Sequence, residues 1–294
     1  MWLLFASLTA FFEACKDATG KQSLKTIDEY SVLFSFSAVG VLFMLPVLWL
    51  SGGIPTLGAN FWWALLVGGS LNILAFTLYV RAIKIADLSL TVPLVTLTPL
   101  FLLVTSPLIV NEQPTPADAI GVILLVIGSY VLNITPSRGL SGVEAYGWAP
   151  LQSMARNPGS RLMLSVAFIW SITSNFDKVG VLNSSPLFWA VSLFTVIAGG
   201  MVPFVFWRPS SAGLKPLLVQ WRLLGMTGGF NAIAITCQMF ALTLAPVAQV
   251  IAVKRMSALL SVLFGHFCFG EKGLRSRLLG ASIMVSGVVI MSLS

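Results

Sequence analysis

The chain has 294 residues, of which 57% are hydrophobic and only 9% are charged, and its mean hydropathy is +0.92. Soluble domains are far less apolar, so this composition indicates an integral membrane protein and leaves no room for a separate soluble domain. The net charge of +7 would suggest a nucleic-acid partner in a soluble protein. Here most basic residues lie near expected helix ends, where membrane orientation and lipid head groups explain them, so we expect the lipid bilayer and no nucleic acid as a partner.

Apolar runs nearly fill the sequence, each close to the about 20 residues that a helix needs to cross a bilayer. The ten expected membrane-spanning helices are residues 2–20, 29–50, 59–82, 88–110, 117–135, 160–179, 186–207, 217–243, 246–269 and 274–293. Short connections make most neighbouring helices antiparallel, whereas one long connection separates two sets of five. We therefore expect an all-α membrane fold with a first five-helix repeat at 1–135, a loop at 136–159 and a second repeat at 160–294.

The two halves are related in sequence. A shift of 159 residues aligns the end of the first half with the end of the second without a gap. Identical residues then coincide in pairs that include Gly69 with Gly228, Asn72 with Asn231, Glu112 with Glu271, Gly121 with Gly280, and Gly128 with Gly287. Because five is odd, the two tandem copies have opposite orientations in the membrane. Such inverted repeats are typical of secondary transporters, whose substrate site lies near the midplane between the copies.

This pattern resembles the drug/metabolite transporter superfamily in its ten-helix, EamA-like form. The resemblance covers essentially the whole chain and includes an acid that closes the fourth and ninth helices, Glu112 in "VNEQPTPADAIG" and Glu271 in "FGEKGLRSRLLG". It implies a transporter with a central cavity lined mainly by helices 1, 3, 4, 6, 8 and 9. Members of this superfamily export amino acids, move other metabolites, or exchange sugar phosphates and nucleotide sugars, so the resemblance leaves the substrate class open.

The first helix carries "EACKD", in which Glu13, Lys16 and Asp17 are three and four residues apart and so share one helix face. A carboxylate inside the membrane can carry a proton, so Glu13 is the candidate for proton coupling. The alternative is that the three side chains form an internal ion pair, which could also include a cation of the ninth helix.

Polar stripes follow the third and eighth helices at equivalent places in the repeat. Asn72 and Tyr79 are seven residues apart, as are Asn231 and Gln238, so each pair shares one helix face. These side chains are expected to face the central axis, where they would bind substrate or make interhelical hydrogen bonds. The expected substrate-binding set also includes Asn175 of the sixth helix.

Two further helical patterns concern the shape of the bundle. The fourth helix contains Pro93, Pro99 and Pro107, and nearby threonines could satisfy the carbonyl groups that a proline kink frees. One of these threonines, Thr96, is also expected to bind substrate. In the fifth and tenth helices glycines recur every seven residues, which indicates close helix packing between the halves or between protomers.

Lys254 and Arg255 are adjacent cations about eight or nine residues into the ninth span, roughly 12 to 13 Å deep at 1.5 Å per residue. Exposing one such charge to lipid costs at least about 2.5 to 3.5 kcal/mol. The equivalent residues of the first half are Val95 and Thr96, so the cations do not belong to the shared scaffold. Their chemistry predicts an anionic ligand, because Lys supplies a point charge and Arg a planar fork for phosphate or carboxylate.

The resemblance supports this hypothesis, because the sugar-phosphate and nucleotide-sugar branch of the superfamily has a Lys-Arg pair at the corresponding place. The sequence departs from the phosphate translocators in the fourth helix, where a further lysine would be expected near Val95. The alternative is that Lys254 and Arg255 pair with buried acids such as Glu13 or with helix-end carbonyls.

Several absences limit the other functions. The chain has no phosphate-binding loop and no nucleophile and base at a usable spacing, so we expect no enzyme activity. The three cysteines, Cys15, Cys237 and Cys268, lie singly, and the one histidine, His266, is expected at a helix end, so we expect no metal site and no cofactor.

The sequence thus predicts a secondary active transporter that moves a small polar metabolite with an anionic group, phosphorylated or carboxylated, by alternating access. The alternatives are an exporter of amino acids or amphipathic compounds, a lipid-handling flippase, or a membrane scaffold that transports nothing. We expect a multi-pass protein of the plasma (inner) membrane, either a monomer or a homodimer, that binds a small-molecule substrate.

An even number of spans places both termini on one side. Of the 17 Lys and Arg residues, all except Lys178, Lys254 and Arg255 belong to connections or helix ends after spans 1, 3, 5, 7 and 9. The positive-inside rule makes that side cytoplasmic and the termini exoplasmic. Ten-helix relatives usually have cytoplasmic termini, so charge and resemblance disagree about the orientation.

Overall fold

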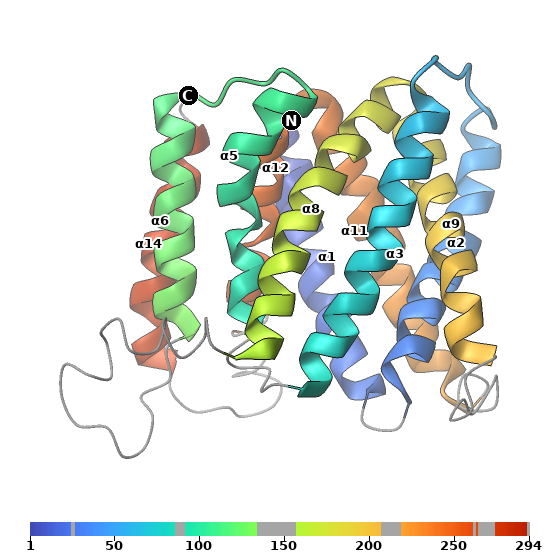
Figure 1. Cartoon of the computed structure of the whole chain (residues 1–294), viewed down its shortest axis with the longest axis horizontal. Helices are drawn as coiled ribbons and strands as arrows, with labels where there is room; N and C mark the ends of the chain where they lie inside the picture. The colour runs from blue at the N-terminus through green and yellow to red at the C-terminus, as the bar shows by residue number, and fades with distance from the viewer. Residues whose placement is uncertain are drawn as a thin grey trace.

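The computed structural model describes residues 1–24, 27–85, 92–133, 157–206, 219–260, 263 and 274–292, and these contain helices but no strand (Figure 1). The elements are α1 (Trp2–Ser23), α2 (Glu29–Leu50), α3 (Phe61–Ile85), the 3-10 helix η1 (Val92–Leu97), α5 (Thr98–Ile109), α6 (Pro116–Asn133), α8 (Pro158–Leu182), α9 (Pro186–Phe206), α11 (Trp221–Leu244), α12 (Val247–Lys254) and α14 (Leu274–Ser292). Nine of the ten expected spans each contain one of these elements and the fourth contains two, η1 and α5; both termini lie at the same end of the bundle.

Local sequence accounts for where several helices begin. Asp28 precedes α2 and accepts a hydrogen bond from the backbone N–H of Ser31 at 3.1 Å. Asn157 caps α8 in the same way, accepting from the N–H of Gly159 at 2.8 Å, and Pro158 occupies the first turn, where its missing N–H costs nothing. The long apolar segments that follow such caps bury one face inside the bundle and leave the other to the lipid.

The packing of the helices follows the repeat. The third helix, α3, packs along the sixth, α8, and the first, α1, packs along the eighth, α11. In the repeat the first span corresponds to the sixth and the third to the eighth. The pair of α3 with α8 is therefore the symmetry equivalent of the pair of α1 with α11. The pairs α6 with α14 and α2 with α9 each join equivalent helices of the two halves. The fold is therefore an all-α membrane bundle of two inverted five-helix repeats whose helices pack mainly across the halves.

The pair α6 and α14 lies at one edge of the bundle, green and red in Figure 1. Glycines let these two backbones approach closely: a Cβ on Gly128 would lie 2.6 Å from the backbone N of Met284, and one on Gly287 would lie 2.5 Å from the backbone O of Gly121. The glycine pattern therefore serves contact between the two halves, one of the two roles that the sequence allowed.

The fourth and ninth spans are interrupted, although the sequence predicts a continuous helix for the ninth. In the fourth, η1 gives way to α5 at Thr98, whose hydroxyl donates to the carbonyl of Val95 at 2.7 Å. In the ninth, α12 ends at Lys254, a turn follows at Arg255, and residues 257–260 are helical again. The two interruptions lie at equivalent places in the repeat, and the second puts both cations at a helix C-terminus, where the helix dipole favours positive charge.

We predict that Gly128→Ala lowers the free energy of unfolding by about 1 to 3 kcal/mol, because the added methyl group collides with the backbone of α14. Gly199→Ala in α9 is the matched control, since a Cβ there meets nothing within 4 Å. This change should be neutral or raise stability by up to about 1 kcal/mol, as expected from helix propensity. Thermal unfolding of the detergent-solubilised variants measures both, and equal effects would contradict the tight contact.

Candidate functional site

The charged side chains of α1 form a small ion cluster inside the bundle. The Lys16 Nζ lies 2.6 Å from Glu13 Oε1 and 3.6 Å from Asp17 Oδ1. Both members of the shorter pair are largely buried, with side-chain exposures of 16% and 17%. The spacing of three and four residues along the helix therefore places one base between two acids.

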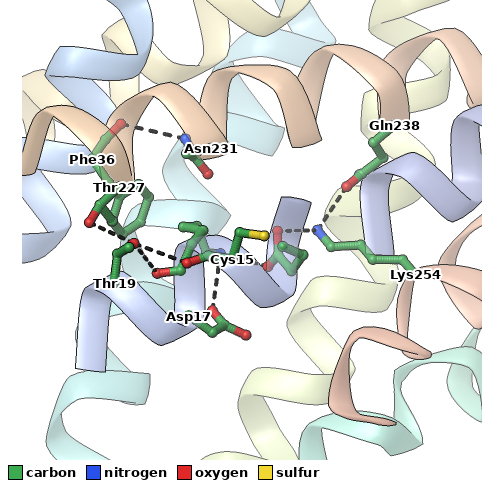
Figure 2. Close-up of polar contacts among 10 residues, drawn as sticks. Cys15, Asp17, Thr19, Phe36, Thr227, Asn231, Gln238 and Lys254 are labelled. Atoms are coloured by element: carbon green, nitrogen blue, oxygen red, sulfur yellow. Dashed lines mark hydrogen bonds and ion pairs between the residues drawn. The ribbon is translucent and has the colours of Figure 1, made fainter. Parts of the chain in front are cut away.

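Lys254 reaches this cluster from the end of α12. Its Nζ donates to Gln238 Oε1 of α11 at 2.7 Å and lies 3.9 Å from Glu13 Oε2 (Figure 2). The close partner of Lys254 is thus a neutral amide, while the acid is at the outer limit of ion-pair distance. An internal ion pair between Lys254 and Glu13, which the sequence offers as an alternative, is present only in this loose form.

Arg255 has a different environment. One of its terminal nitrogens donates to the Thr98 hydroxyl at 3.0 Å, and its guanidinium carbon lies 5.8 Å from the centre of the Trp170 ring. Its Nε is buried without a hydrogen-bond partner. In the described part of the chain no carboxylate oxygen comes within 4.0 Å of the guanidinium. A hydroxyl group and an aromatic face therefore hold this cation, and part of its hydrogen-bonding capacity remains unused.

Aromatic rings connect the two cationic regions. Tyr79 lies 5.7 Å from the Trp170 ring, Phe76 lies 5.9 Å from the same ring, and Phe36 lies 6.0 Å from Phe76, all between centroids. At the far end of this row the Lys16 Nζ lies 5.6 Å from the centre of the Phe36 ring. The row places aromatic faces beside Lys16 and Arg255, and such faces attract cations.

The charged side chains of α1 and of the end of α12 do not balance one another; a further buried acid, Asp177 of α8, lies outside this group and accepts a hydrogen bond from Trp189. We define the central cluster as Glu13, Lys16, Asp17, Lys254 and Arg255, which supply three cations and two acids. With every group ionised the cluster carries one positive charge in excess. Since Lys16 contacts both acids, the excess lies on the side of Lys254 and Arg255.

Other residues expected to bind substrate have partners outside the cluster. The Asn231 amide makes a long hydrogen bond of 3.5 Å to the carbonyl of Phe36, and Asn72 donates to the carbonyl of Gly68 in its own helix at 3.0 Å. Asn175 donates to the Thr105 hydroxyl of α5 at 3.1 Å. Beside these bonds, α1 and α11 are linked by Thr19 and Thr227 at 2.9 Å (Figure 2).

The structure therefore brings Gln238 and Tyr79 to the charged groups but directs the asparagines to contacts within or between helices. Thr96 is buried in η1 with 7% of its surface exposed. His266, Cys268 and Glu271, which the sequence analysis singled out, lie outside the described residues.

Two contacts of Arg255 were not expected from the sequence. Trp170 is an aromatic residue in an apolar helix, which in isolation indicates packing or lipid contact. A shift of 157 residues, however, aligns the first helix with the sixth, as it places Lys21 opposite Lys178, and it makes Trp170 the counterpart of Glu13. That correspondence is the signal that could have placed it at the centre. Thr98 is one of the threonines near the prolines of the fourth helix, for which the sequence analysis expected only bonds to carbonyl groups freed by a kink.

Among curated proteins, none matches the chain. A solved structure described only as the crystal structure of a protein superimposes with a TM-score of 0.74, covering 98% of this chain and 95% of the other. The sequence identity is 16%, so this likeness shows the shared fold alone.

The model of the EamA-like transporter family matches residues 1–134 and 157–293, which is nearly the whole chain. Its two matched segments each hold five of the helical spans described above. The chain therefore belongs to the EamA-like transporter family and is a membrane transporter.

Proposed function

We propose that the protein is a secondary active transporter of a small organic anion, carboxylated or phosphorylated, that works by alternating access in the plasma (inner) membrane. The observation that carries this proposal is the half-buried side chain of Arg255, whose Nε is fully buried. The guanidinium donates a hydrogen bond to the Thr98 hydroxyl and lies over the Trp170 ring. No acid among the described residues lies within ion-pair distance of it.

Removing a cation from water costs several kcal/mol unless an opposite charge or a set of hydrogen bonds compensates it. Thr98 and Trp170 compensate Arg255 in part, and an anion would supply the rest. A carboxylate or phosphate is suited to this role, because it accepts two parallel hydrogen bonds from the planar fork of an arginine.

Lys254 would share in the binding. Its close partner, Gln238, is neutral, and its distance of 3.9 Å from Glu13 leaves the ammonium group able to turn toward a second anion. The adjacent cations would then hold one acidic group together, while Tyr79 and Trp170 would contact the remainder of the substrate.

A second candidate is the export of zwitterionic amino acids, and one observation favours it. Glu13 and Asp17 lie on α1 beside the cations, so the site offers carboxylates as well as positive groups. The ammonium group of an amino acid would then compete with Lys16 for these acids, while its carboxylate would bind Arg255.

We predict that Arg255→Gln lowers uptake of the anion by proteoliposomes about 10- to 150-fold, since hydrogen bonds to charged groups contribute about 1.5 to 3 kcal/mol. Lys254→Ala should abolish transport of the same substrate while the protein stays folded. Arg222→Gln is the matched control, because it removes the same charge from an exposed side chain at the edge of α11. Unchanged uptake by folded Arg255→Gln or Lys254→Ala protein would refute the anion site.

Transport of the substrate could be driven by a proton gradient through Glu13. If Glu13 carries the coupled proton, Glu13→Gln should remove the acceleration of transport by an imposed pH gradient but retain exchange of substrate across the membrane. Asp17→Asn is the control, because Asp17 lies farther from Lys16 and is more exposed, with a side-chain exposure of 53%. Parallel measurements of gradient-driven uptake and exchange separate the two roles, and an intact response in Glu13→Gln protein would exclude Glu13 as the coupling group.

A further inference from the structure

A second ion pair lies away from the central cluster, at the end of the bundle that carries both termini. Glu112 follows α5 in the first half, and its carboxylate pairs with the ammonium group of Lys178 on α8 in the second half. Both side chains are largely shielded, with exposures of 19% for the acid and 13% for the base. The pair therefore joins the two inverted repeats.

The same two side chains hold the start of α12. Glu112 Oε2 accepts a hydrogen bond from the backbone N–H of Val247, the first residue of α12, at 2.8 Å. Lys178 Nζ donates to the carbonyl of Ala245 at 2.9 Å. An acid at the start of a helix also interacts favourably with the helix dipole. The chain just before α12 and the first turn of α12 are thus fixed by one acid from α5 and one base from α8.

The helix that begins at this pair ends at the central cluster. Val247–Val253 are all buried, so α12 is a packed element between Glu112 and Lys254. Helix α5 runs between the same two places, since it starts at Thr98, which binds Arg255, and ends just before Glu112. Polar contacts therefore join α5 and α12 at both ends, and a movement of either helix at the cluster is passed to the ion pair.

We propose that Glu112 and Lys178 form a latch that closes the path to the cluster from the side of the termini and that opens once in each transport cycle. This inference rests on the alternating-access part of the proposed function, not on the identity of the substrate. In it Glu112 and Lys178 are positioning residues, which control access to Lys254 and Arg255 without binding substrate.

An ion pair is suited to a latch for a physical reason. The attraction within a buried ion pair is largely offset by the cost of removing its members from water. When the two halves separate, water solvates both groups, so breaking this pair costs less free energy than the attraction between its charges alone. Packed apolar side chains at the same place would gain no such hydration when they separate.

The test uses the whole protein in nanodiscs, with Cys15, Cys237 and Cys268 replaced by alanine. Two probes are matched: Ser106→Cys on α5, near the latch, and Ser160→Cys at the opposite end of α8. Each serine is 2% exposed, and neither hydroxyl has a hydrogen-bond partner, so the replacement by sulfur is conservative. The measured quantity is the rate at which a water-soluble maleimide labels each cysteine.

Glu112→Gln and Lys178→Met should each raise the labelling rate at position 106 about tenfold, a population change that corresponds to about 1.4 kcal/mol, and lower it at position 160. Opposite changes are required because opening one side closes the other. Equal changes at both probes, or no change at either, would overturn the latch and leave a static contact. Labelling requires no substrate, so this result stands apart from the success or failure of the anion assignment.

A second measurement tests the latch if Glu112→Gln or Lys178→Met protein does not fold. Cysteines introduced by Glu112→Cys and Lys178→Cys in the same cysteine-free protein are joined by a reducible bifunctional thiosulfonate. The cross-link should arrest transport in proteoliposomes, and its reduction should restore it. Transport that continues with the cross-link in place would show that the two residues do not separate during the cycle.

Discussion

The guanidinium of Arg255 must be compensated within a bilayer, and the centre of the molecule is arranged around this requirement. The interruption of the ninth span places Arg255 and Lys254 at the C-terminus of α12, where the helix dipole favours their charge. Thr98 and Trp170 contribute a hydrogen bond and an aromatic face. Lys16 meanwhile occupies the acids of α1. Among the described residues the Nε of Arg255 has no hydrogen-bond partner, and this is the physical basis on which we propose an anionic substrate.

The inverted repeat explains how one scaffold supports an asymmetric site. Equivalent helices provide equivalent positions near the centre, but the residues at those positions differ. Lys254 and Arg255 correspond to Val95 and Thr96, and Glu13 corresponds to Trp170. The paired packing of α3 with α8 and of α1 with α11 keeps the symmetric frame. Each half thus carries charges that the other lacks, Glu13 in the first and Lys254 with Arg255 in the second, while the frame needed for two alternating conformations was retained.

The helical spans and the repeat could be predicted from the sequence, because hydropathy and identical residues such as Glu112 and Glu271 are visible in one chain. The break after Lys254 could not, since no proline or glycine marks it and hydropathy does not depend on backbone angles. Partners were equally hidden: Asn231 and Gln238 share a helix face, yet one bonds the backbone of α2 and the other bonds Lys254. Contacts across helices depend on side-chain rotation, which periodicity does not specify.

The most direct test of the account is whether an anion stabilises the folded protein through Arg255. Thermal unfolding should be followed for the natural protein and for Arg255→Gln in the presence of phosphorylated metabolites, carboxylates, amino acids and neutral sugars. A ligand at about 100 times its Kd adds about 2.7 kcal/mol of stability. The account predicts that an anion raises the unfolding temperature of the natural protein and has no such effect on the variant. Stabilisation by neutral compounds alone, or equal stabilisation of both proteins by the anion, would contradict it.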